Sequence, residues 1–349
     1  MNRLFNFFAV LAIGGMSLCC SSCEKSGEGS GGEQAGTKDV IVVGGYSHAA
    51  RISTFNPADY PYMKYPSRVY CFGTSPSADG KWYINQTYEQ KIEVMRKAMT
   101  SSQEAFLVIG GGGTAKNMYV MGTDEAKRNA YVEAMVAYAH ANGYDGIDID
   151  WETAWSENPP LRIPAEDLVA LLQKIREEMA ALPSDTKVRK LSCALSSIEH
   201  EIGGAVKDYV DEINVMIYDC YGETEDADGT YPHAPMSQFI ERLGNYRDAG
   251  VPNEKIIAGV PFYGGDKKQE GTPTQTYNVL FAQSGGAITA ATNSWDGYAF
   301  NGVDLIREKT QYLVDNGYAG IMVWEISQDI DYAEPLSLMR AIKSVTAVR

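Results

Sequence analysis

Short apolar segments and longer amphipathic segments alternate along the chain from residue 38 onward. Eight apolar runs have the length and composition expected of buried strands. Most of the segments between them carry apolar residues at helical spacing. The predicted strands cover residues 40–47, 68–74, 105–112, 146–152, 190–196, 211–219, 256–263 and 320–326. The predicted helices cover residues 88–100, 124–142, 166–182, 237–249 and 303–316.

The regular alternation of strand and helix predicts an α/β fold with a parallel sheet. The count of eight strands predicts closure of that sheet into a (β/α)8 TIM barrel. Segment 51–66 is the least regular part, because it is rich in proline and tyrosine and shows no clear helix. One long loop, residues 264–300, follows the seventh predicted strand. Since no other segment offers room for a second domain, we expect residues 38–349 to form a single domain.

The fourth predicted strand carries carboxylates at alternate positions, within the sequence Asp-Gly-Ile-Asp-Ile-Asp-Trp-Glu at 145–152. In an extended strand, Asp148, Asp150 and Glu152 share one face and the apolar residues between them share the other. Close carboxylates cannot all stay ionised at neutral pH, so at least one should keep its proton. A protonated carboxyl group beside ionised ones is what acid-assisted cleavage of a glycosidic bond needs. An acid-rich strand edge, or a metal site, is the alternative.

Further candidate residues fall at the ends of other predicted strands. Tyr218 and Asp219 end the sixth strand, Tyr263 ends the seventh, and Trp324 lies near the end of the eighth. In (β/α)8 barrels the catalytic residues lie at the C-terminal ends of the strands. The chemically suggestive residues therefore cluster where such a barrel places its active site.

Composition narrows the range of partners. The formal net charge of −15 argues against nucleic acid or an anionic membrane surface, and weakly favours a neutral or basic substrate. The 22 tyrosines, 10 phenylalanines and 5 tryptophans would suit carbohydrate stacking, although an aromatic core would explain them equally well. Cys71, Cys193 and Cys220 stand alone in apolar stretches, which is typical of buried thiols rather than of disulfides or a zinc site. No metal and no cofactor is expected.

The N-terminal segment is not expected to belong to the fold. An apolar run at 4–18 is too short to span a bilayer comfortably and is placed like the core of a signal peptide. Three cysteines and a Ser/Gly-rich stretch follow it, an order that resembles a bacterial lipoprotein. We expect a signal peptide at 1–22, lipid attachment at Cys23 and a flexible tether at 23–37, which would anchor the protein in the cell envelope. A cleaved signal with a free secreted product is the alternative.

The acidic motif resembles the signature of glycoside hydrolase family 18, the family of chitinases and endo-β-N-acetylglucosaminidases. The likeness extends over roughly residues 38 to 345, with its motifs in the right order. Those motifs are Met216-Ile217-Tyr218-Asp219, Gly259-Val260-Pro261-Phe262-Tyr263-Gly264, Val323-Trp324-Glu325 with Gln328-Asp329, Gly110-Gly111 and, loosely, His233-Ala234-Pro235.

The resemblance implies a role for each acidic residue in a substrate-assisted mechanism. Glu152 would protonate the leaving oxygen and then serve as base toward water. The substrate's own 2-acetamido oxygen would attack, while Asp150 hydrogen-bonds the acetamido nitrogen and stabilises the oxazolinium ion. Asp148 would share a proton with Asp150, and Tyr218 would steady the acetamido group. Asp145 has the opposite strand parity, so we expect it to act as structural support.

Other aromatic and polar residues are candidates for substrate binding. For Tyr218, Trp324, Tyr46 and Phe72, ordinary core packing is the alternative. Trp295, with Tyr298 and Phe300 in the long loop, could form a sugar platform or simply anchor the loop. The substrate-binding candidates are Trp324, Asp219, Met216, Tyr46, Phe72, Gly111, Tyr263 and Trp295.

Two departures from the family pattern bear on the cleft. Thr153-Ala154-Trp155 follows the glutamate where many family chitinases have Tyr-Pro. Loop 264–300 looks too short for the α+β domain that walls the groove in larger members, so we expect a shallower cleft.

The resemblance favours retaining cleavage of β-1,4-linked N-acetylglucosamine in oligo- or polysaccharides through an oxazolinium intermediate. An endo-β-N-acetylglucosaminidase acting on the chitobiose core of N-glycans is the alternative. That subgroup, however, often has another acid where Trp151 stands and lacks the tryptophan matching Trp324. A sugar-binding lectin is a third interpretation, although such members usually replace the glutamate that is intact here as Glu152.

Overall fold

The computed structural model describes residues 39–269 and 271–347. The predicted signal peptide, the lipid-attachment residue Cys23 and the tether lie outside these residues. No helix in the described part of the chain is both long enough and apolar enough to cross a membrane.

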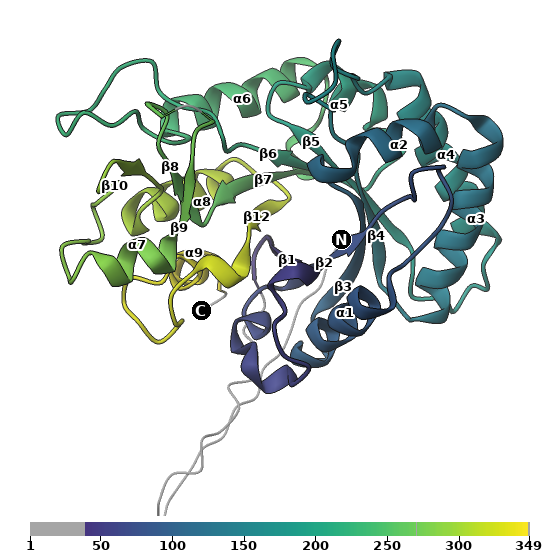
Figure 1. Ribbon diagram of the computed structural model, residues 1–349, viewed down its shortest axis with the longest axis horizontal. Helices are drawn as coiled ribbons and strands as arrows, with labels where there is room; N and C mark the ends of the chain where they lie inside the picture. The colour runs from purple at the N-terminus through teal and green to yellow at the C-terminus, as the bar shows by residue number, and fades with distance from the viewer. Residues whose placement is uncertain (1–38, 270, 348–349) are drawn as a thin grey trace, which may run out of the picture. The chain divides into compact units, whose positions relative to one another are not determined.

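Eight parallel strands close into a barrel, which confirms the predicted TIM-barrel fold (Figure 1). Around the barrel the order is β1-β12-β7-β6-β5-β4-β3-β2. Each predicted strand overlaps one of these strands. The barrel strands are β1 (Val42–His48), β2 (Arg68–Thr74), β3 (Glu104–Gly110), β4 (Gly146–Asp150), β5 (Lys190–Ser196), β6 (Glu212–Met216), β7 (Ile256–Pro261) and β12 (Gly320–Trp324).

Helices surround the barrel, and the five predicted helices are confirmed to within two residues at each end (Figure 1). Asn85 caps the first of the five and Asp124 the second, and each side chain accepts backbone N–H groups of its helix's first turn, two at Asn85 and one at Asp124. Segment 51–66 forms 3-10 turns and no α-helix. The helices are α1 (Gln86–Ala98), α2 (Ala115–Gly122), α3 (Glu125–Ala141), α4 (Ala165–Ala181), α5 (His200–Val206), α6 (Met236–Asp248), α7 (Tyr277–Gln283), α8 (Val303–Asp315) and α9 (Leu338–Thr346).

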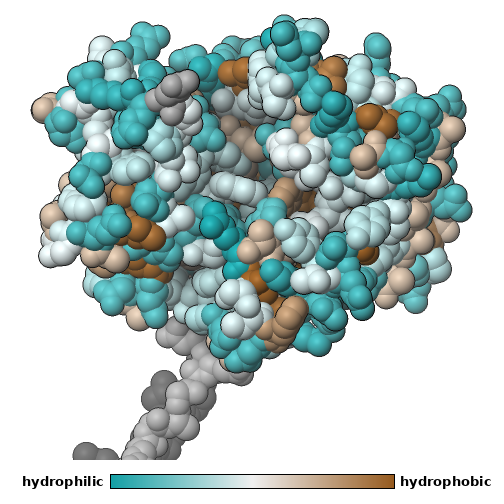
Figure 2. Space-filling model, in the orientation of Figure 1, coloured by the Kyte–Doolittle hydropathy of each residue, from teal (hydrophilic) through white to brown (hydrophobic). Residues whose placement is uncertain are grey.

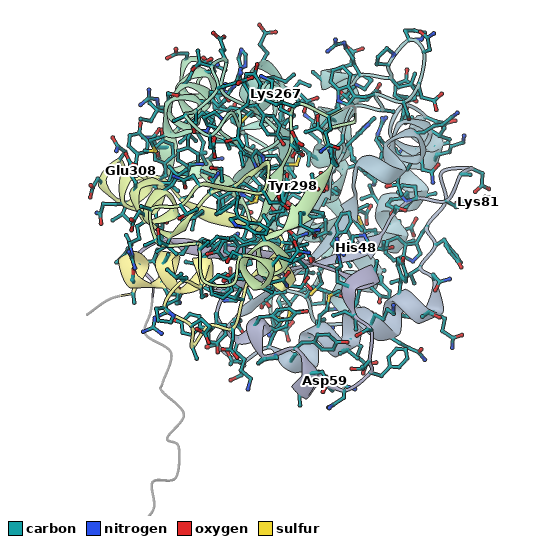
Figure 3. The ribbon with its side chains drawn as sticks, turned by 60° about the vertical axis from the view of Figure 1, so that its left-hand side comes forward. His48, Asp59, Lys81, Lys267, Tyr298 and Glu308 are labelled. Carbon is teal, nitrogen blue, oxygen red and sulfur yellow. The ribbon has the colours of Figure 1, made fainter. Side chains whose placement is uncertain are left out.

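Strand residues alternate between the barrel interior and the layer beneath the helices. Ile147 and Ile149 of β4 join the large hydrophobic core between strands and helices. Asp148 and Asp150 point the other way, as the alternation in the sequence predicts. Figure 3 shows that charged side chains such as that of Lys81 point outward into solvent. A second, smaller cluster fills the barrel interior with Tyr46, Tyr70, Phe72, Phe106, Val108, Ile257 and Met322.

Segment 264–300 is not the plain loop that the sequence suggests. It contributes to a four-stranded antiparallel sheet of order β10-β11-β8-β9 and contains helix α7. Strands of two or three residues carry no readable periodicity, which is why the prediction missed them. The short strands are β8 (Tyr263–Gly265), β9 (Thr274–Thr276), β10 (Ser294–Trp295) and β11 (Tyr298–Ala299).

Candidate active site

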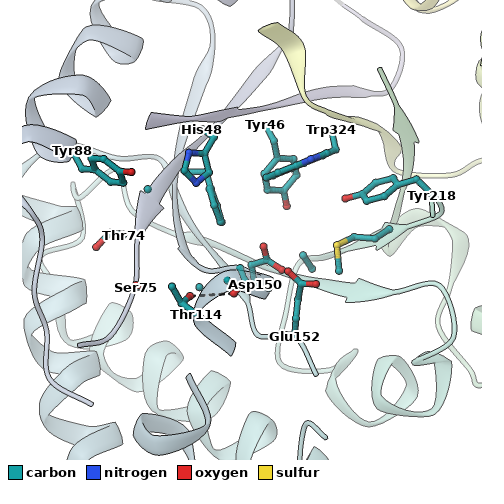
Figure 4. A pocket seen from close by; sticks show the side chains of 18 of the residues that line it. Tyr46, His48, Thr74, Ser75, Tyr88, Thr114, Asp150, Glu152, Tyr218 and Trp324 are labelled. Carbon is teal, nitrogen blue, oxygen red and sulfur yellow. Dashed lines mark hydrogen bonds between the residues drawn. The ribbon is translucent and has the colours of Figure 1, made fainter. Parts of the chain in front are cut away.

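A cavity of about 390 Å³ opens at the C-terminal ends of the barrel strands. Figure 2 shows it as a hollow near the middle of the visible face, and Figure 4 shows the side chains that line it. Glu152, Tyr218 and Asp219 lie on the loops just after β4 and β6, because both strands end earlier than predicted. The predicted residues that line the cavity are Tyr46, Phe72, Gly111, Asp150, Glu152, Met216, Tyr218, Asp219 and Trp324.

Glu152 lies beside Asp150 in the cavity (Figure 4). Burial raises the pKa of Glu152, and the negative charges of Glu199 and Asp219 raise it further. A hydrogen bond from the Gly112 N–H acts in the opposite direction. A raised pKa lets Glu152 hold its proton to higher pH than an exposed glutamate does, which suits a general acid.

Asp150 is the least satisfied carboxyl group of the cluster. Its Oδ1 is buried and has no hydrogen-bond partner among the residues that the structure describes. Burial raises the pKa of Asp150 well above its ordinary value, and the charges of Glu152 and Asp148 raise it further. Asp150 therefore holds its proton to higher pH than an exposed aspartate does, and its unpartnered oxygen can accept a hydrogen bond from a donor that enters the cavity.

Asp148 lies one pleat deeper and is fully enclosed. It accepts hydrogen bonds from the Tyr46 hydroxyl at 2.7 Å, the Ser192 hydroxyl at 2.6 Å and the Asn214 side-chain amide at 3.0 Å. Burial raises the pKa of Asp148, while these three hydrogen bonds lower it. No hydrogen bond joins Asp148 to Asp150 in the described structure, and the sharing of a proton between them stays a prediction. Asp148 is the better-stabilised anion, and Asp150 is the better place for the proton.

Tyr218 and Asp219 face the acidic pair from β6, across the barrel mouth. Burial raises the pKa of Tyr218 well above its ordinary value, so its hydroxyl keeps a proton to donate. Asp219 accepts a hydrogen bond of 2.5 Å from the Tyr263 hydroxyl, and its N–H donates to Nε2 of His233 at 3.0 Å. Tyr263 thus contacts Asp219 and is not among the residues that line the cavity, so its role in substrate binding stays a prediction.

Trp324 forms the aromatic side of the cavity together with Tyr46 and Phe72. Its ring centroid lies 5.8 Å from that of Tyr46 and 5.6 Å from that of Phe72. Tyr46 also stacks on Tyr70 at 4.3 Å. Each of the three rings packs against other aromatic rings and also borders the cavity. The same side chain can therefore serve core packing and substrate contact.

Two glycines at the end of β3 allow the backbone to pass close to the acidic strand. Gly110 and Gly111 adopt φ values of 120° and 98°, which favour glycine. A Cβ on Gly110 would collide with the Asp150 carbonyl oxygen, and one on Gly111 would collide with the Phe72 ring. The Gly111 N–H in turn donates to that same carbonyl oxygen at 2.7 Å. The pair therefore fixes where β4 ends and the cavity begins.

Two predicted residues lie away from the cavity. Trp295 is on β10 of the insertion and packs half-buried against the large hydrophobic core, so anchoring explains it better than sugar binding does. Asp145 immediately precedes β4, and its side chain accepts the Ala105 N–H at 2.9 Å, at the opposite end of the barrel.

The prediction also missed residues of the site. His48, Thr74 and Tyr88 line the cavity from β1, β2 and α1. The position of His48 at the very end of the first strand could have revealed it. Glu199 acts electrostatically on Glu152 from the loop after β5, and nothing in its local sequence signals this. Among residues 39–269 and 271–347, no group of three or more His, Cys, Asp or Glu side chains is placed to hold a metal ion.

Comparison with known proteins agrees with this geometry. The family model for glycosyl hydrolases family 18 matches residues 43–329. Chitinase 1 from Aphanocladium album is 25% identical, with 78% of each chain covered. In fold, the class V chitinase from Nicotiana tobaccum aligns with a TM-score of 0.71 and 20% identity, covering 88% of this chain and 99% of that one. The chitinase-like agglutinin RobpsCRA from Robinia pseudoacacia aligns with a TM-score of 0.68 and 21% identity, covering 86% and 98%. The chain belongs to glycosyl hydrolases family 18 and is a chitinase-like glycosidase.

Proposed function

We propose that the protein cleaves β-1,4-linked N-acetylglucosamine in chitin-type oligosaccharides by retaining, substrate-assisted catalysis. The observation that carries the proposal is the buried Oδ1 of Asp150, which has no hydrogen-bond partner among the described residues and lies between Glu152 and Asp148 in the acidic cluster. This buried oxygen lacks a hydrogen-bond donor, and the N–H of an acetamido group would supply one. A bound sugar would therefore complete the hydrogen bonding of the cluster.

The acid step belongs to Glu152. Its raised pKa lets it hold a proton to higher pH than an exposed glutamate does, and it borders the cavity where a glycosidic oxygen would lie. After transfer of that proton to the leaving oxygen, the resulting carboxylate can take a proton from the incoming water. The Gly112 N–H stabilises that carboxylate in the interval between the two steps.

The nucleophilic step belongs to the substrate. Attack of the acetamido oxygen on the anomeric carbon breaks the glycosidic bond and forms a cyclic oxazolinium ion. Asp150 would hydrogen-bond the nitrogen of this ion, and Asp150 and Asp148 together place negative charge beside it. The Tyr218 hydroxyl, facing the pair from β6, would hold the acetamido oxygen in position. Water then opens the ring from the same face, so the configuration is retained.

The experiment compares chromogenic glycosides of chitobiose and cellobiose. We expect turnover of the chitobioside, negligible turnover of the cellobioside, and inhibition by a thiazoline analogue of the oxazolinium ion. Comparable rates on both glycosides would refute the substrate-assisted mechanism. A lectin would bind the chitobioside and release no chromophore. Mass spectrometry of products from chitin oligomers and from a high-mannose glycoprotein, incubated in parallel, separates a chitinase from an N-glycan endoglycosidase.

A further inference from the structure

An aromatic wall runs along the cavity away from Trp324. We use this name for the rings of Trp324, Phe72, His48 and Tyr88, all of which line the cavity. Phe72 lies 5.6 Å from Trp324, His48 lies 4.7 Å from Phe72, and Tyr88 lies 6.3 Å from His48. Figure 4 shows His48 and Tyr88 on the side of the cavity opposite Tyr218. The wall thus continues beyond the place where Trp324 and the acidic pair meet.

His48 is held in one orientation within this wall. Its Nδ1 accepts the Ala50 N–H at 2.9 Å, as the N-cap of a 3-10 turn. Its own N–H donates to the buried Glu325 carboxylate at 3.0 Å. It follows Tyr46 by two residues on β1, so both side chains point into the barrel, with His48 nearer the mouth.

The hydrogen bonding of His48 also settles which nitrogen carries the proton. Burial lowers the pKa of His48, and the positive charges of Arg51 and Lys91 lower it further, so the ring is neutral at pH 7. Because Nδ1 is an acceptor, the single ring proton must be on Nε2. Nε2 makes no hydrogen bond to any residue that the structure describes. His48 therefore presents a fixed N–H donor at the cavity.

We propose that His48 is a specificity-determining residue, which donates from Nε2 to an oxygen of a second saccharide unit bound along the aromatic wall. This inference rests on the proposed function, because the ligand is the neighbour of the unit that is cleaved. The acceptor is a neutral oxygen, either a hydroxyl or an acetamido carbonyl. A donor that is held in place before binding loses little conformational freedom when the substrate binds. The enzyme therefore gains catalytic efficiency on substrates long enough to reach His48, compared with substrates too short to reach it.

Two substitutions separate the donor from the other roles of the side chain. His48→Phe keeps a ring against Phe72 but removes both the donor and the cap. His48→Asn keeps an oxygen that can cap the turn, since asparagine is a favoured N-cap, but it is too short to donate into the cavity. His140→Phe, on the exposed face of α3, makes the same replacement far from the cavity and is the control.

The readout is the ratio of kcat/KM on a chromogenic chitobioside, which offers a second saccharide unit, to kcat/KM on the chromogenic glycoside of a single N-acetylglucosamine, which does not. We expect both His48 variants to lower this ratio by about 10-fold, the effect of leaving one buried acceptor unpaired, and the control to keep the wild-type ratio. A wild-type ratio in His48→Phe would show that only the ring matters. A wild-type ratio in His48→Asn would show that only the cap matters. Either result overturns the inference, and thermal unfolding verifies that each variant is folded.

The same measurement distinguishes this inference from the proposed function. If the wild-type protein cleaves neither substrate, the proposed function fails and the ligand assigned to His48 fails with it. If the wild type cleaves both substrates and one variant keeps the wild-type ratio, the inference about His48 fails alone.

Discussion

Gly112 offers a direct way to disturb the catalytic carboxyl group without changing it. The residue lies in the turn after β3, and its N–H donates to Glu152. A Cβ at this position would lie 3.1 Å from Oε1 and 3.3 Å from Oε2 of Glu152. Contacts this short require the neighbour to move by a few tenths of an ångström. In Gly112→Ala the carboxyl group must therefore shift, and the hydrogen bond that holds it must lengthen.

The expected loss of kcat in Gly112→Ala follows from how much the substitution weakens the hydrogen bond to Glu152 and displaces its carboxyl group. A hydrogen bond to a charged group contributes about 1.5–3 kcal/mol, and a small displacement weakens it without abolishing it. Misplacement of a reacting group by about 1 Å can cost roughly 100-fold in rate, so a few tenths should cost less. We expect kcat of Gly112→Ala to fall by about 10-fold. The free energy of unfolding should change little, because alanine is compatible with this turn.

Gly113→Ala is the matched control, since a Cβ there meets no atom within 4 Å. Both substitutions remove the same backbone freedom from the unfolded chain, so that contribution cancels between them. The assay is steady-state hydrolysis of the chromogenic chitobioside across pH, with thermal unfolding in parallel. Because the Gly112 N–H lowers the pKa of Glu152, which must be protonated to act as the acid, its substitution should also move the alkaline limb of kcat to higher pH. Equal losses in the two variants would refute the reasoning.

Four further predictions follow from the acids, a buried lysine and the N-terminus. Glu152→Gln should lower kcat by at least about 100-fold while sugar binding survives, as calorimetry would show, and more than half of wild-type turnover would contradict the assignment. Asp150→Asn should lower kcat more than it changes KM. The loss of transition-state stabilisation in the double variant Asp150→Asn, Asp148→Asn should be smaller than the sum of the two single losses, and strict additivity would rule out coupling between the aspartates. Burial lowers the pKa of Lys309 from 10.5 in the unfolded chain to about 7 in the folded protein. Between these two pH values the unfolded chain binds more protons than the folded protein. The cost of burying the charged lysine therefore reduces the free energy of unfolding fully below pH 7, and this cost fades as pH rises. Relative to Lys309→Met, the wild-type free energy of unfolding in urea should therefore gain up to about 4 kcal/mol from pH 7 to pH 10, and a constant difference would contradict this. We also propose that a lipid on Cys23 anchors the protein. Replacing Cys23 and the cysteines at 19 and 20 together by serine should then release soluble, active protein. If the unmodified protein already fractionates as soluble, the anchor is contradicted.

The barrel could be predicted because its signals are local. Alternation in β4 and helical spacing in α3 or α4 appear within a few residues of sequence, and buried strands and long helices impose these patterns. Helices α5 and α7 escaped prediction because each has only seven residues, and α5 contains Gly203 and Gly204. The small sheet after β7 escaped because its strands pair through contacts that no short window records.

The site could be predicted where a residue's role follows from its place at a strand end. Glu152, Tyr218 and Trp324 were expected at the barrel mouth in this way, and all three line the cavity. Roles that depend on contacts between distant segments were not found. Tyr263 contacts Asp219 rather than the cavity, and Glu199 acts on Glu152 through a loop fixed by its hydrogen bond from Thr153 at 3.0 Å.

The distribution of hydrogen-bond donors explains how two adjacent aspartates can differ in charge. Burial favours the neutral form of both, but Asp148 accepts three hydrogen bonds whereas Asp150 accepts none at its buried Oδ1. These contacts favour the proton on Asp150 over Asp148 in the free protein, and an entering acetamido N–H would supply the missing donor and make ionisation of Asp150 easier. Asp150 would then release its proton to solvent, and its negative charge would lie beside the anomeric carbon when a substrate with that group is bound. A sugar bearing a 2-hydroxyl could also donate to Asp150, but it carries no oxygen able to attack, so binding and catalysis would separate at this one substituent.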